Sequence, residues 1–279
     1  MPELPELEVM KDNLDRLIKG RRLEALQILK PYIQKTPLPE GLPGQLVTAV
    51  SRRGKYIEID LERHRFIIHL MLSGRLRFSL QNQPVLKSAS AVMRFDSGFI
   101  QFLEESKLKQ MGLWIVPKDI RIDDLKSLGP EPLSPGFTPD RLRSLLAASR
   151  ERLKLFLVNQ ANVAGIGNAY SDEICWEAGL SPFKPSSKLT PDEVENVHEA
   201  ISNVLNHAIT ETRREAGDVL DIPEKRGFLK VHRHKDEPCP RCGTKIAWVS
   251  TTSRNTYYCP GCQAEGKVLK DGRTSKFLK

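Results

Sequence analysis

Apolar residues recur along the chain with two different periods, and the period changes near residue 118. Residues 6–19 have apolar positions three and four residues apart, which predicts an amphipathic helix with Pro5 in its first turn and Gly20 just after its end. Short apolar runs separated by polar or glycine-containing breaks follow, and they predict strands at 46–50, 56–61, 66–72, 75–80, 91–95, 99–103 and 112–116. Many short strands at this spacing indicate a β-sandwich or a β-barrel.

Residues 118–137 are rich in proline and glycine and predict a linker between two domains. Beyond this linker the apolar positions follow the helical period. Helices are expected from Thr138, at 153–158, at 169–178 and from Thr190, where Glu193 completes a capping box. A glycine-rich turn at 163–168 precedes the third of these helices. Such a turn can present backbone N–H groups to a phosphate, or it can simply connect two helices.

Four of the five cysteines form two Cys-x-x-Cys pairs separated by sixteen residues, and they are Cys239, Cys242, Cys259 and Cys262. Each pair can bend two thiolates toward one tetrahedral centre, and the span between the pairs fits a β-hairpin. The pattern therefore predicts one structural zinc ion with a closed coordination sphere. A thioredoxin-like redox pair and disulfide bonds are the alternatives. Cys175 lies in an apolar helical run and is expected to be a small buried side chain.

The basic charge of the chain is concentrated at its C-terminal end. The net charge is +8, and residues 223–279 contain 13 lysines and arginines against five aspartates and glutamates, whereas residues 1–222 contain 30 of each sign. A basic excess on a small zinc module indicates a polyanionic partner, most commonly nucleic acid. A solvated basic surface without a partner is the alternative.

The chain has 279 residues, of which 39% are hydrophobic, and this is enough for two domains or slightly more. No apolar run reaches membrane-spanning length, and no signal peptide is recognisable. A soluble intracellular protein is therefore expected, in which cysteines bind metal and do not form disulfides. No oligomerisation pattern is visible in the sequence, so a monomer is expected.

The sequence begins Met1-Pro-Glu-Leu-Pro5. If Met1 is removed, Pro2 carries a free secondary amine, which can attack an aldehyde-like carbon and form an iminium ion. Because an α-amino group titrates near about 7.7–8.0, part of it is neutral and nucleophilic at pH 7. Glu3 is the neighbouring candidate proton donor. An ordinary start segment is the alternative.

Several separate motifs are spread over nearly the full length of the chain. In chain order they are Met1–Glu6, Arg53–Tyr56, His69–Gly74, Leu128–Leu133, Asn159–Glu173, Glu237–Gly243 and Arg254–Cys259. Together they resemble the formamidopyrimidine-DNA glycosylase / endonuclease VIII family of base-excision repair enzymes, of bacterial type. The first motif is similar to the catalytic start of that family, the fifth to its helix-two-turn-helix element, and the last two to its zinc finger.

The resemblance implies that Pro2 attacks C1′ of a damaged nucleotide while Glu3 protonates the sugar ring oxygen. Lys55, on a strand, would contact the phosphate beside the lesion and assist strand cleavage. Asn168 and Arg254 would grip flanking phosphates. The base would be flipped, because C1′ chemistry is inaccessible inside a stacked duplex. From the residues alone, Lys55 could instead be an exposed strand lysine, and Arg254 a solvated charge at the tip of the hairpin.

Two loops depart from the family pattern. In the formamidopyrimidine branch an Arg-Arg-Phe-Gly loop fills the void left by the flipped base, whereas residues 104–112 contain neither Arg-Arg nor Phe. The void-filling candidates here are Met71, Leu72, Gln110 and Met111, and Lys109 is a candidate DNA contact. Residues 213–235 also lack the runs that form the cap over 8-oxoguanine in that branch. Both departures predict a preferred substrate other than 8-oxoguanine.

The expected fold class is α+β, with an N-terminal β-sandwich and a leading helix, then a helical helix-two-turn-helix domain with a C-terminal zinc finger. The expected segments are a catalytic domain at 1–117, a linker at 118–137, a DNA-binding domain at 138–222, a zinc-finger module at 223–264 and a basic tail at 265–279. The expected function is that of a DNA glycosylase and abasic-site lyase in the bacterial cytoplasm. It would act through a Schiff base on double-stranded DNA that contains a damaged base or an abasic site. The alternatives are a non-catalytic binder of such DNA on the same scaffold, and an RNA-directed or structural zinc protein.

Overall fold

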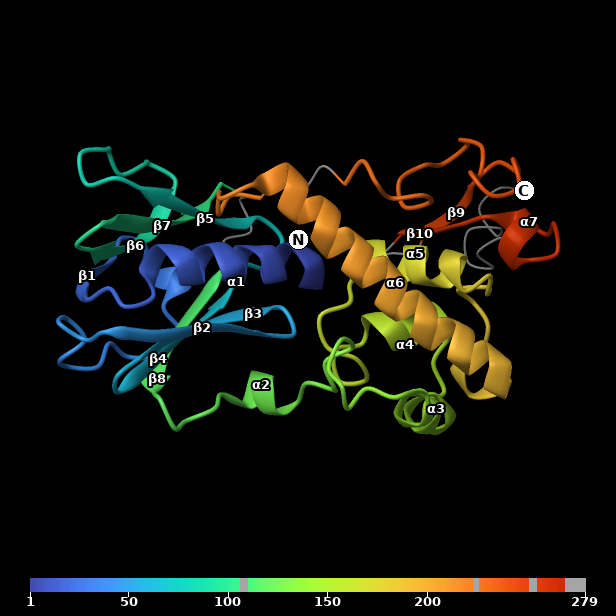
Figure 1. Cartoon of the computed structure of the whole chain (residues 1–279), viewed down its shortest axis with the longest axis horizontal. Helices are drawn as coiled ribbons and strands as arrows, with labels where there is room; N and C mark the ends of the chain where they lie inside the picture. Colours follow the sequence, from blue (N-terminus) through green and yellow to red (C-terminus); the bar gives the residue numbers. More distant parts are fainter. Residues whose placement is uncertain (106–109, 223–225, 251–254, 269–279) are drawn as a thin grey trace. The chain divides into compact units, whose positions relative to one another are not determined.

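The structure is a computed structural model that describes residues 1–105, 110–222, 226–250 and 255–268. The chain forms two compact units (Figure 1). Unit 1 consists of residues 1–126 and 209–226, and unit 2 consists of residues 127–208 and the described residues from 227 onward.

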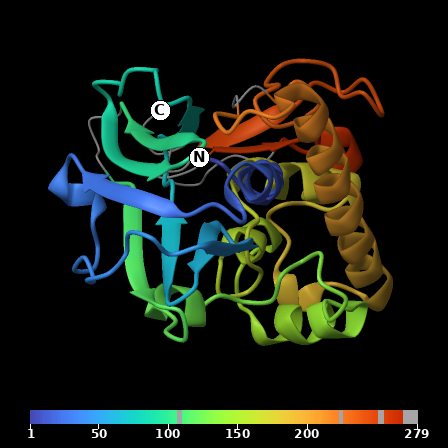
Figure 2. The same cartoon turned by 60° about the vertical axis from the view of Figure 1, so that its left-hand side comes forward.

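Unit 1 is a sandwich of two four-stranded antiparallel sheets. One sheet has the order β1 (Leu23–Ile28), β6 (Ala89–Phe95), β7 (Gly98–Glu104) and β5 (Gly74–Ser79). The other has the order β2 (Val47–Arg53), β3 (Tyr56–Leu61), β4 (His64–His69) and β8 (Gly112–Pro117). Figures 1 and 2 show the sheets as two separate layers. The predicted β-sandwich is confirmed, and the seven predicted strands are present with ends shifted by a few residues. The eighth, β1, had no predicted strand of its own.

The leading helix α1 (Leu4–Ile18) runs along one side of the two layers (Figures 1 and 2). Its apolar face, formed by Leu7, Met10, Leu14 and Ile18, is buried in the core shared with both sheets. Burial of each such side chain contributes about 1.5–3 kcal/mol. Because these residues recur with the helical period, one face of the helix collects them, and the 3.6-residue period therefore predicted this helix. Two short elements complete the first segment of the unit, η1 (Pro31–Ile33) and α2 (Asp123–Lys126).

Unit 2 combines helices with a β-hairpin. Its elements are α3 (Pro139–Ala148), α4 (Leu153–Val158), α5 (Asn168–Glu177), η2 (Ser186–Lys188), the part of α6 (Pro191–Ala216) up to Ala208, β9 (Ala247–Ser250), β10 (Asn255–Tyr258) and α7 (Pro260–Gln263). The predicted caps are present, because the Thr138 hydroxyl accepts the Arg141 N–H at 3.2 Å and the capping box between Thr190 and Glu193 is closed at 2.8 and 3.3 Å. Within the described ranges no helix is both long and apolar enough to cross a membrane.

The boundary between the units differs from the expected segment limits. The last turns of α6 and the residues up to 226 belong to unit 1, although residues 138–222 were expected in one helical domain. Asn13 of α1 explains the difference, since its side-chain amide donates to the carbonyl oxygens of Gly217 at 2.9 Å and Val219 at 2.8 Å. Leu220 adds an apolar anchor in the sandwich core. Contacts between residues 200 positions apart leave no local pattern in the sequence.

Candidate active site and zinc centre

Pro2 and Glu3 lie at the N-terminal end of α1. Glu3 is the N-cap residue of this helix and is 3% exposed, while Pro2 is partly exposed. The Glu3 N–H donates to the Glu6 carboxylate at 2.8 Å, as part of a capping box between these two residues. This explains why α1 begins at Leu4, earlier than the predicted start at residue 6. The predicted nucleophile and proton donor are therefore attached to the fixed end of a helix.

Arg226 lies against the same helix end. Its Nε and Nη2 atoms bind the two carboxylate oxygens of Glu6 at 2.7 and 2.9 Å, and Nη2 also donates to the Met1 carbonyl oxygen at 3.3 Å. Its Nη1 atom lies 3.8 Å from a carboxylate oxygen of Glu3. The sequence reasoning identified neither Glu6 nor Arg226. The three-residue spacing of Glu3 and Glu6 was the available signal for the first, and none existed for the second.

Lys55 lies in the two-residue turn that joins β2 to β3. Arg53 and Tyr56 are paired on either side of this turn, and Gly54 takes a φ of +56°, a conformation that glycine adopts without strain. Lys55 is only 7% exposed. The structure thus places the lysine at a hairpin turn and not within a strand, and it excludes the exposed strand lysine considered above.

His69 ends β4 next to this turn, and its ring meets that of Tyr56 edge-on with the centroids 4.5 Å apart. Burial and the positive charge of Lys55 lower the pKa of His69 to about 4. The neutral ring has a defined task, because its Nδ1 atom accepts the Met71 N–H at 3.1 Å. That contact holds Met71 at a φ of +52°, a conformation that is unusual for a residue other than glycine. The turn after β4 therefore depends on an unprotonated His69.

We expect the free energy of unfolding to fall as the pH drops from 6.5 to 5, and we expect His69 to cause part of this loss. Because the pKa is about 4 in the folded protein and 6.5 ordinarily, only the unfolded chain gains a proton in this range. At 1.36 kcal/mol per pKa unit, the loss is roughly 2 kcal/mol by pH 5. Urea unfolding at both pH values should show a smaller decrease for His69→Gln than for the wild type. An equal decrease in both proteins would contradict this assignment.

The two loops with void-filling candidates share one anchor, the buried carboxylate of Glu104. It accepts the Gln110 N–H at 3.0 Å, the Met111 N–H at 3.2 Å and the Ser73 hydroxyl at 3.3 Å. One carboxylate thus fixes the turn after β4 and the end of the loop before β8 together.

The four void-filling candidates differ in exposure. Leu72 is 55% exposed, Gln110 is exposed and Met71 is partly buried. Met111 is 0% exposed and belongs to the sandwich core, whereas a void filler needs a side chain that can reach the DNA. Its position between the mostly polar residues 104–110 and the apolar run of β8 made it ambiguous in the sequence. Lys109 lies outside the described residues.

The four predicted zinc ligands come together at one point. Their Sγ atoms all lie within 4.8 Å of one another, with Cys239 and Cys262 at 3.9 Å and Cys242 and Cys259 at 3.4 Å. A tetrahedral zinc ion with Zn–S bonds of about 2.3 Å requires sulfur atoms about 3.8 Å apart, so the donor set fits this metal. A single redox pair or two separate disulfides would not require all four sulfurs to meet. The four cysteines constitute a site for one structural zinc ion.

Helix α5 supports this site through Trp176. The indole N–H of Trp176 donates to the Cys239 sulfur at 3.4 Å, and the guanidinium carbon of Arg241 lies 4.2 Å from the centre of the indole ring. Hydrogen bonds to a ligand atom orient it toward the metal. Cys175, on the same helix, is fully buried, and burial raises the pKa of its thiol. It is the inert small side chain predicted from the sequence.

A buried charge network joins α4, α5 and the zinc module. Asp172 binds the Lys154 ammonium at 2.6 Å and the His232 Nδ1 atom at 2.7 Å. Lys154 also donates to the Asn255 carbonyl oxygen, in β10, at 2.8 Å. Next to it, the Glu173 carboxylate accepts three backbone N–H groups of residues 230–232 at 2.8 to 2.9 Å. Two adjacent acidic residues of one helix therefore hold the start of the zinc module and its hairpin.

Replacing Asp172 with alanine should lower the free energy of unfolding by about 3–5 kcal/mol, because the change leaves the buried Lys154 charge without its partner. Denaturant unfolding measures this loss. Asp140→Ala is the matched control in the same unit, since Asp140 forms an exposed ion pair with Arg143. That change should cost less than about 1 kcal/mol. Similar losses in the two variants would show that the buried network contributes no more to the free energy of unfolding than an exposed ion pair does.

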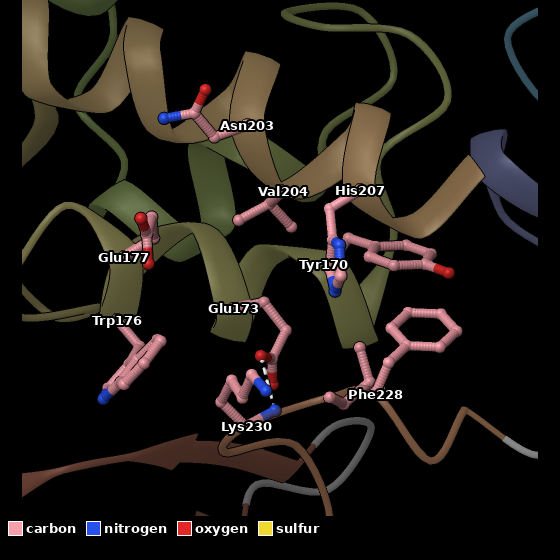
Figure 3. Close-up of a pocket in the computed structure, with 10 residues that line it drawn as sticks. Tyr170, Glu173, Trp176, Glu177, Asn203, Val204, His207, Phe228 and Lys230 are labelled. Carbon is pink, nitrogen blue, oxygen red and sulfur yellow. Dashed lines mark hydrogen bonds between the residues drawn. The ribbon is translucent and has the colours of Figure 1, made fainter. Parts of the chain in front are cut away.

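A pocket of about 180 Å³ lies in unit 2 between α5, α6 and the segment 228–230 (Figure 3). Its walls are mainly apolar and include Tyr170, Trp176, Val204 and Phe228. The Glu173 carboxylate at its edge is occupied by the backbone of the adjoining segment, as the dashed line in Figure 3 shows. None of the predicted catalytic, DNA-binding or zinc-binding residues that the structure describes lines this pocket, so it is not the candidate active site.

Asn168 is the first residue of α5, directly after the N-cap Gly167. Its Oδ1 atom is buried and has no hydrogen-bond partner among the described residues. The oxygen and nitrogen of an asparagine amide can exchange places, so the buried position can equally present an N–H donor. Buried polar atoms are rarely left without a hydrogen-bond partner, and a bound ligand can supply that partner. Arg254, the other predicted phosphate contact, lies outside the described residues.

Three family models match consecutive parts of the chain. The formamidopyrimidine-DNA glycosylase N-terminal domain matches residues 1–110, and the H2TH domain of the same glycosylase matches residues 128–217. A zinc finger found in FPG and IleRS matches residues 236–264, which contain all four cysteines of the zinc site.

Full-length relatives and solved structures agree with these matches. Formamidopyrimidine-DNA glycosylase of Pelotomaculum thermopropionicum is 32% identical over 94% of this chain and 99% of its own length, and that of Symbiobacterium thermophilum is 35% identical over 98% and 93%. Lactococcus lactis Fpg in complex with abasic-site DNA has a TM-score of 0.85 at 28% identity, covering 94% of this chain and 99% of its own. The chain belongs to the formamidopyrimidine-DNA glycosylase family.

Proposed function

We propose that this protein is a base-excision repair DNA glycosylase that also cleaves the strand at the resulting abasic site. The observation that carries the proposal is the N-terminal end of α1, where Pro2 and Glu3 stand side by side at a fixed helix cap. Relatives at 32–35% identity over nearly the whole chain bear the name formamidopyrimidine-DNA glycosylase, which supports the glycosylase activity.

The proposed reaction starts from the free secondary amine that Pro2 acquires when Met1 is removed. The amine nitrogen forms a bond to C1′ of the damaged nucleotide, the bond from C1′ to the base breaks, and the base leaves with a proton. Glu3 protonates the sugar ring oxygen, so that the ring opens and an iminium ion remains between Pro2 and C1′. Loss of a proton from C2′ then expels the 3′ phosphate, and water releases the enzyme from the sugar.

Double-stranded DNA with a damaged base or an abasic site is the proposed partner. Several solved Lactococcus lactis Fpg structures contain abasic-site DNA or DNA with a formamidopyrimidine lesion, and this supports the assignment. Asn168 would bind a phosphate at the N-terminus of α5, where the helix dipole favours an anion. Lys55 would hold the phosphate next to the lesion. Arg254 and Lys109 remain predicted phosphate contacts.

Borohydride trapping tests the proposal. The wild-type protein is mixed with a duplex that contains one abasic site, and sodium borohydride reduces any iminium ion to a stable amine. We expect a covalent protein–DNA adduct that survives denaturation. A protein that binds the duplex tightly but yields no adduct would be a non-catalytic binder, and the proposed lyase activity would be wrong.

We predict that 8-oxoguanine opposite cytosine is cleaved at least about tenfold more slowly than abasic sites or ring-opened purines. Unstacking a base costs a few kcal/mol, and distorted lesions need less of this energy. Among the void-filling candidates that the structure describes, Leu72 is the exposed apolar side chain, and Leu72→Ala should widen the difference. Cleavage rates on duplexes that differ only in the lesion measure it. If 8-oxoguanine is the fastest substrate, the interpretation of the two loops is incorrect.

A further inference from the structure

We propose that Arg226 is a positioning residue that aligns the Pro2 amine and the Glu3 carboxyl for attack on C1′. The inference rests on the proposed function. It assigns a role to a residue that lies more than 220 positions from the nucleophile and belongs to none of the motifs described above.

The geometry of one guanidinium group carries this assignment. Two of its nitrogens bind both oxygens of Glu6, at 2.7 and 2.9 Å, in the bidentate arrangement that fixes direction as well as distance. The same group reaches the Met1 carbonyl oxygen at 3.3 Å and a Glu3 oxygen at 3.8 Å. Arg226 thus contacts the residues immediately before and after Pro2.

These contacts form a chain of constraints on Pro2. Glu6 accepts the Glu3 N–H at 2.8 Å, so the carboxylate that Arg226 holds also fixes the backbone one residue after the nucleophile. The side chain of Arg226 is 13% exposed and those of Glu3 and Glu6 are 4% exposed, so the ion pair between Arg226 and Glu6 is largely shielded from water. A shielded ion pair with bidentate geometry restricts motion far more than an exposed one.

Removal of Met1 would place Arg226 beside the free amine of Pro2. The Met1 carbonyl oxygen and the Pro2 nitrogen belong to one peptide unit, so the Nη2 atom that donates to this oxygen lies near the position of the new amine. The guanidinium then borders both the amine and the Glu3 carboxylate. Misplacing a reacting group by about 1 Å can cost 10²-fold in rate, so loss of this support should act on the chemical step.

The test compares Arg226→Gln and Arg226→Lys with the wild type in single-turnover borohydride trapping at saturating protein. Arg226→Gln should slow adduct formation about 10²-fold, while its Kd for a duplex with a tetrahydrofuran abasic-site analogue changes less than about threefold. Arg226→Lys keeps the charge but cannot bind both Glu6 oxygens in a fork, so its rate should fall between the two. Arg213→Gln is the matched control, because Arg213 forms an exposed ion pair with Asp12 on the same helix α1. Its trapping rate should remain that of the wild type.

Three results would overturn the inference. The first is wild-type trapping by both Arg226 variants. The second is a loss of DNA affinity and melting temperature that accounts for the whole loss of rate, which would make Arg226 a structural residue only. The third is an Arg226→Lys rate no higher than that of Arg226→Gln, when both variants fold. If wild-type protein itself gives no adduct, the proposed function fails first, and the two failures remain distinguishable.

Discussion

Retaining Met1 should abolish covalent trapping of abasic-site DNA. With Met1 in place the Pro2 nitrogen is part of an amide, whose lone pair is delocalised into the carbonyl group, so it cannot attack C1′. A protein carrying an uncleavable N-terminal extension tests this prediction under the borohydride conditions given above. Full trapping by the extended protein would assign the nucleophile to another residue.

The Pro2→Gly variant refines the same prediction. Glycine supplies a primary amine at the same position, so some Schiff-base chemistry can persist, and we expect strand cleavage to fall on the order of 10²-fold. Binding of a tetrahydrofuran-containing duplex should be unchanged, because Pro2 is only partly buried and α1 is capped by Glu3 and Glu6. A variant that loses binding and cleavage together would indicate a damaged fold and would leave the catalytic assignment without support.

Removal of zinc should unfold the zinc-finger module and weaken DNA binding at the same time. Zinc binding by comparable peptides contributes about 10–16 kcal/mol at pH 7, and this free energy is also the folding free energy of the module. A chelator should therefore lower the affinity for the abasic-site analogue duplex by at least about 10²-fold, and added zinc should restore it. The sandwich core of unit 1 contains none of the four cysteines and should keep its fold.

Single cysteine replacements separate the metal from general thiol chemistry. Cys242→Ser should lose most of the bound zinc, which elemental analysis counts per chain, because Cys242 is one of the four converging sulfurs. Cys175→Ala is the control, since Cys175 is buried in α5 and is not one of the four sulfurs gathered at the zinc site. It should retain one zinc ion. A reduced wild-type protein that contains no zinc would refute the assignment of the site.

Local patterns predicted those elements whose cause is local. The period of apolar residues predicted α1 because one face of this helix is buried, and Thr138 and Thr190 marked the starts of α3 and α6 because their hydroxyls cap the first turn. The strands were predicted with shifted ends because pairing and not composition sets where a strand stops. The predicted strand from residue 66 to 72 ends at His69, where the chain turns to cross from one sheet to the other.

The candidate catalytic residues and the zinc ligands were also identified from local patterns. Pro2 and Glu3 were identified from chemistry that needs only adjacent residues, and the two Cys-x-x-Cys pairs from the spacing that a tetrahedral metal requires. The exposure of a side chain does not have a local cause. Lys55 is buried although its neighbours include arginine and glycine, and Met111 is in the core although it follows a polar loop.

By itself the sequence determined the periodic elements, the zinc ligands and the nature of the proposed nucleophile, because each depends on residues a few positions apart. Only the tertiary structure decided which charged and polar groups meet. It brought Arg226 to Glu6, Asp172 to His232 and Asn13 to Val219, pairs that are 220, 60 and 206 positions apart. A buried charge is stable only beside its partner, and the partner is selected by the packing of whole elements. Such pairs have no signature in a single sequence, and here they hold the end of α1 and the zinc module in place.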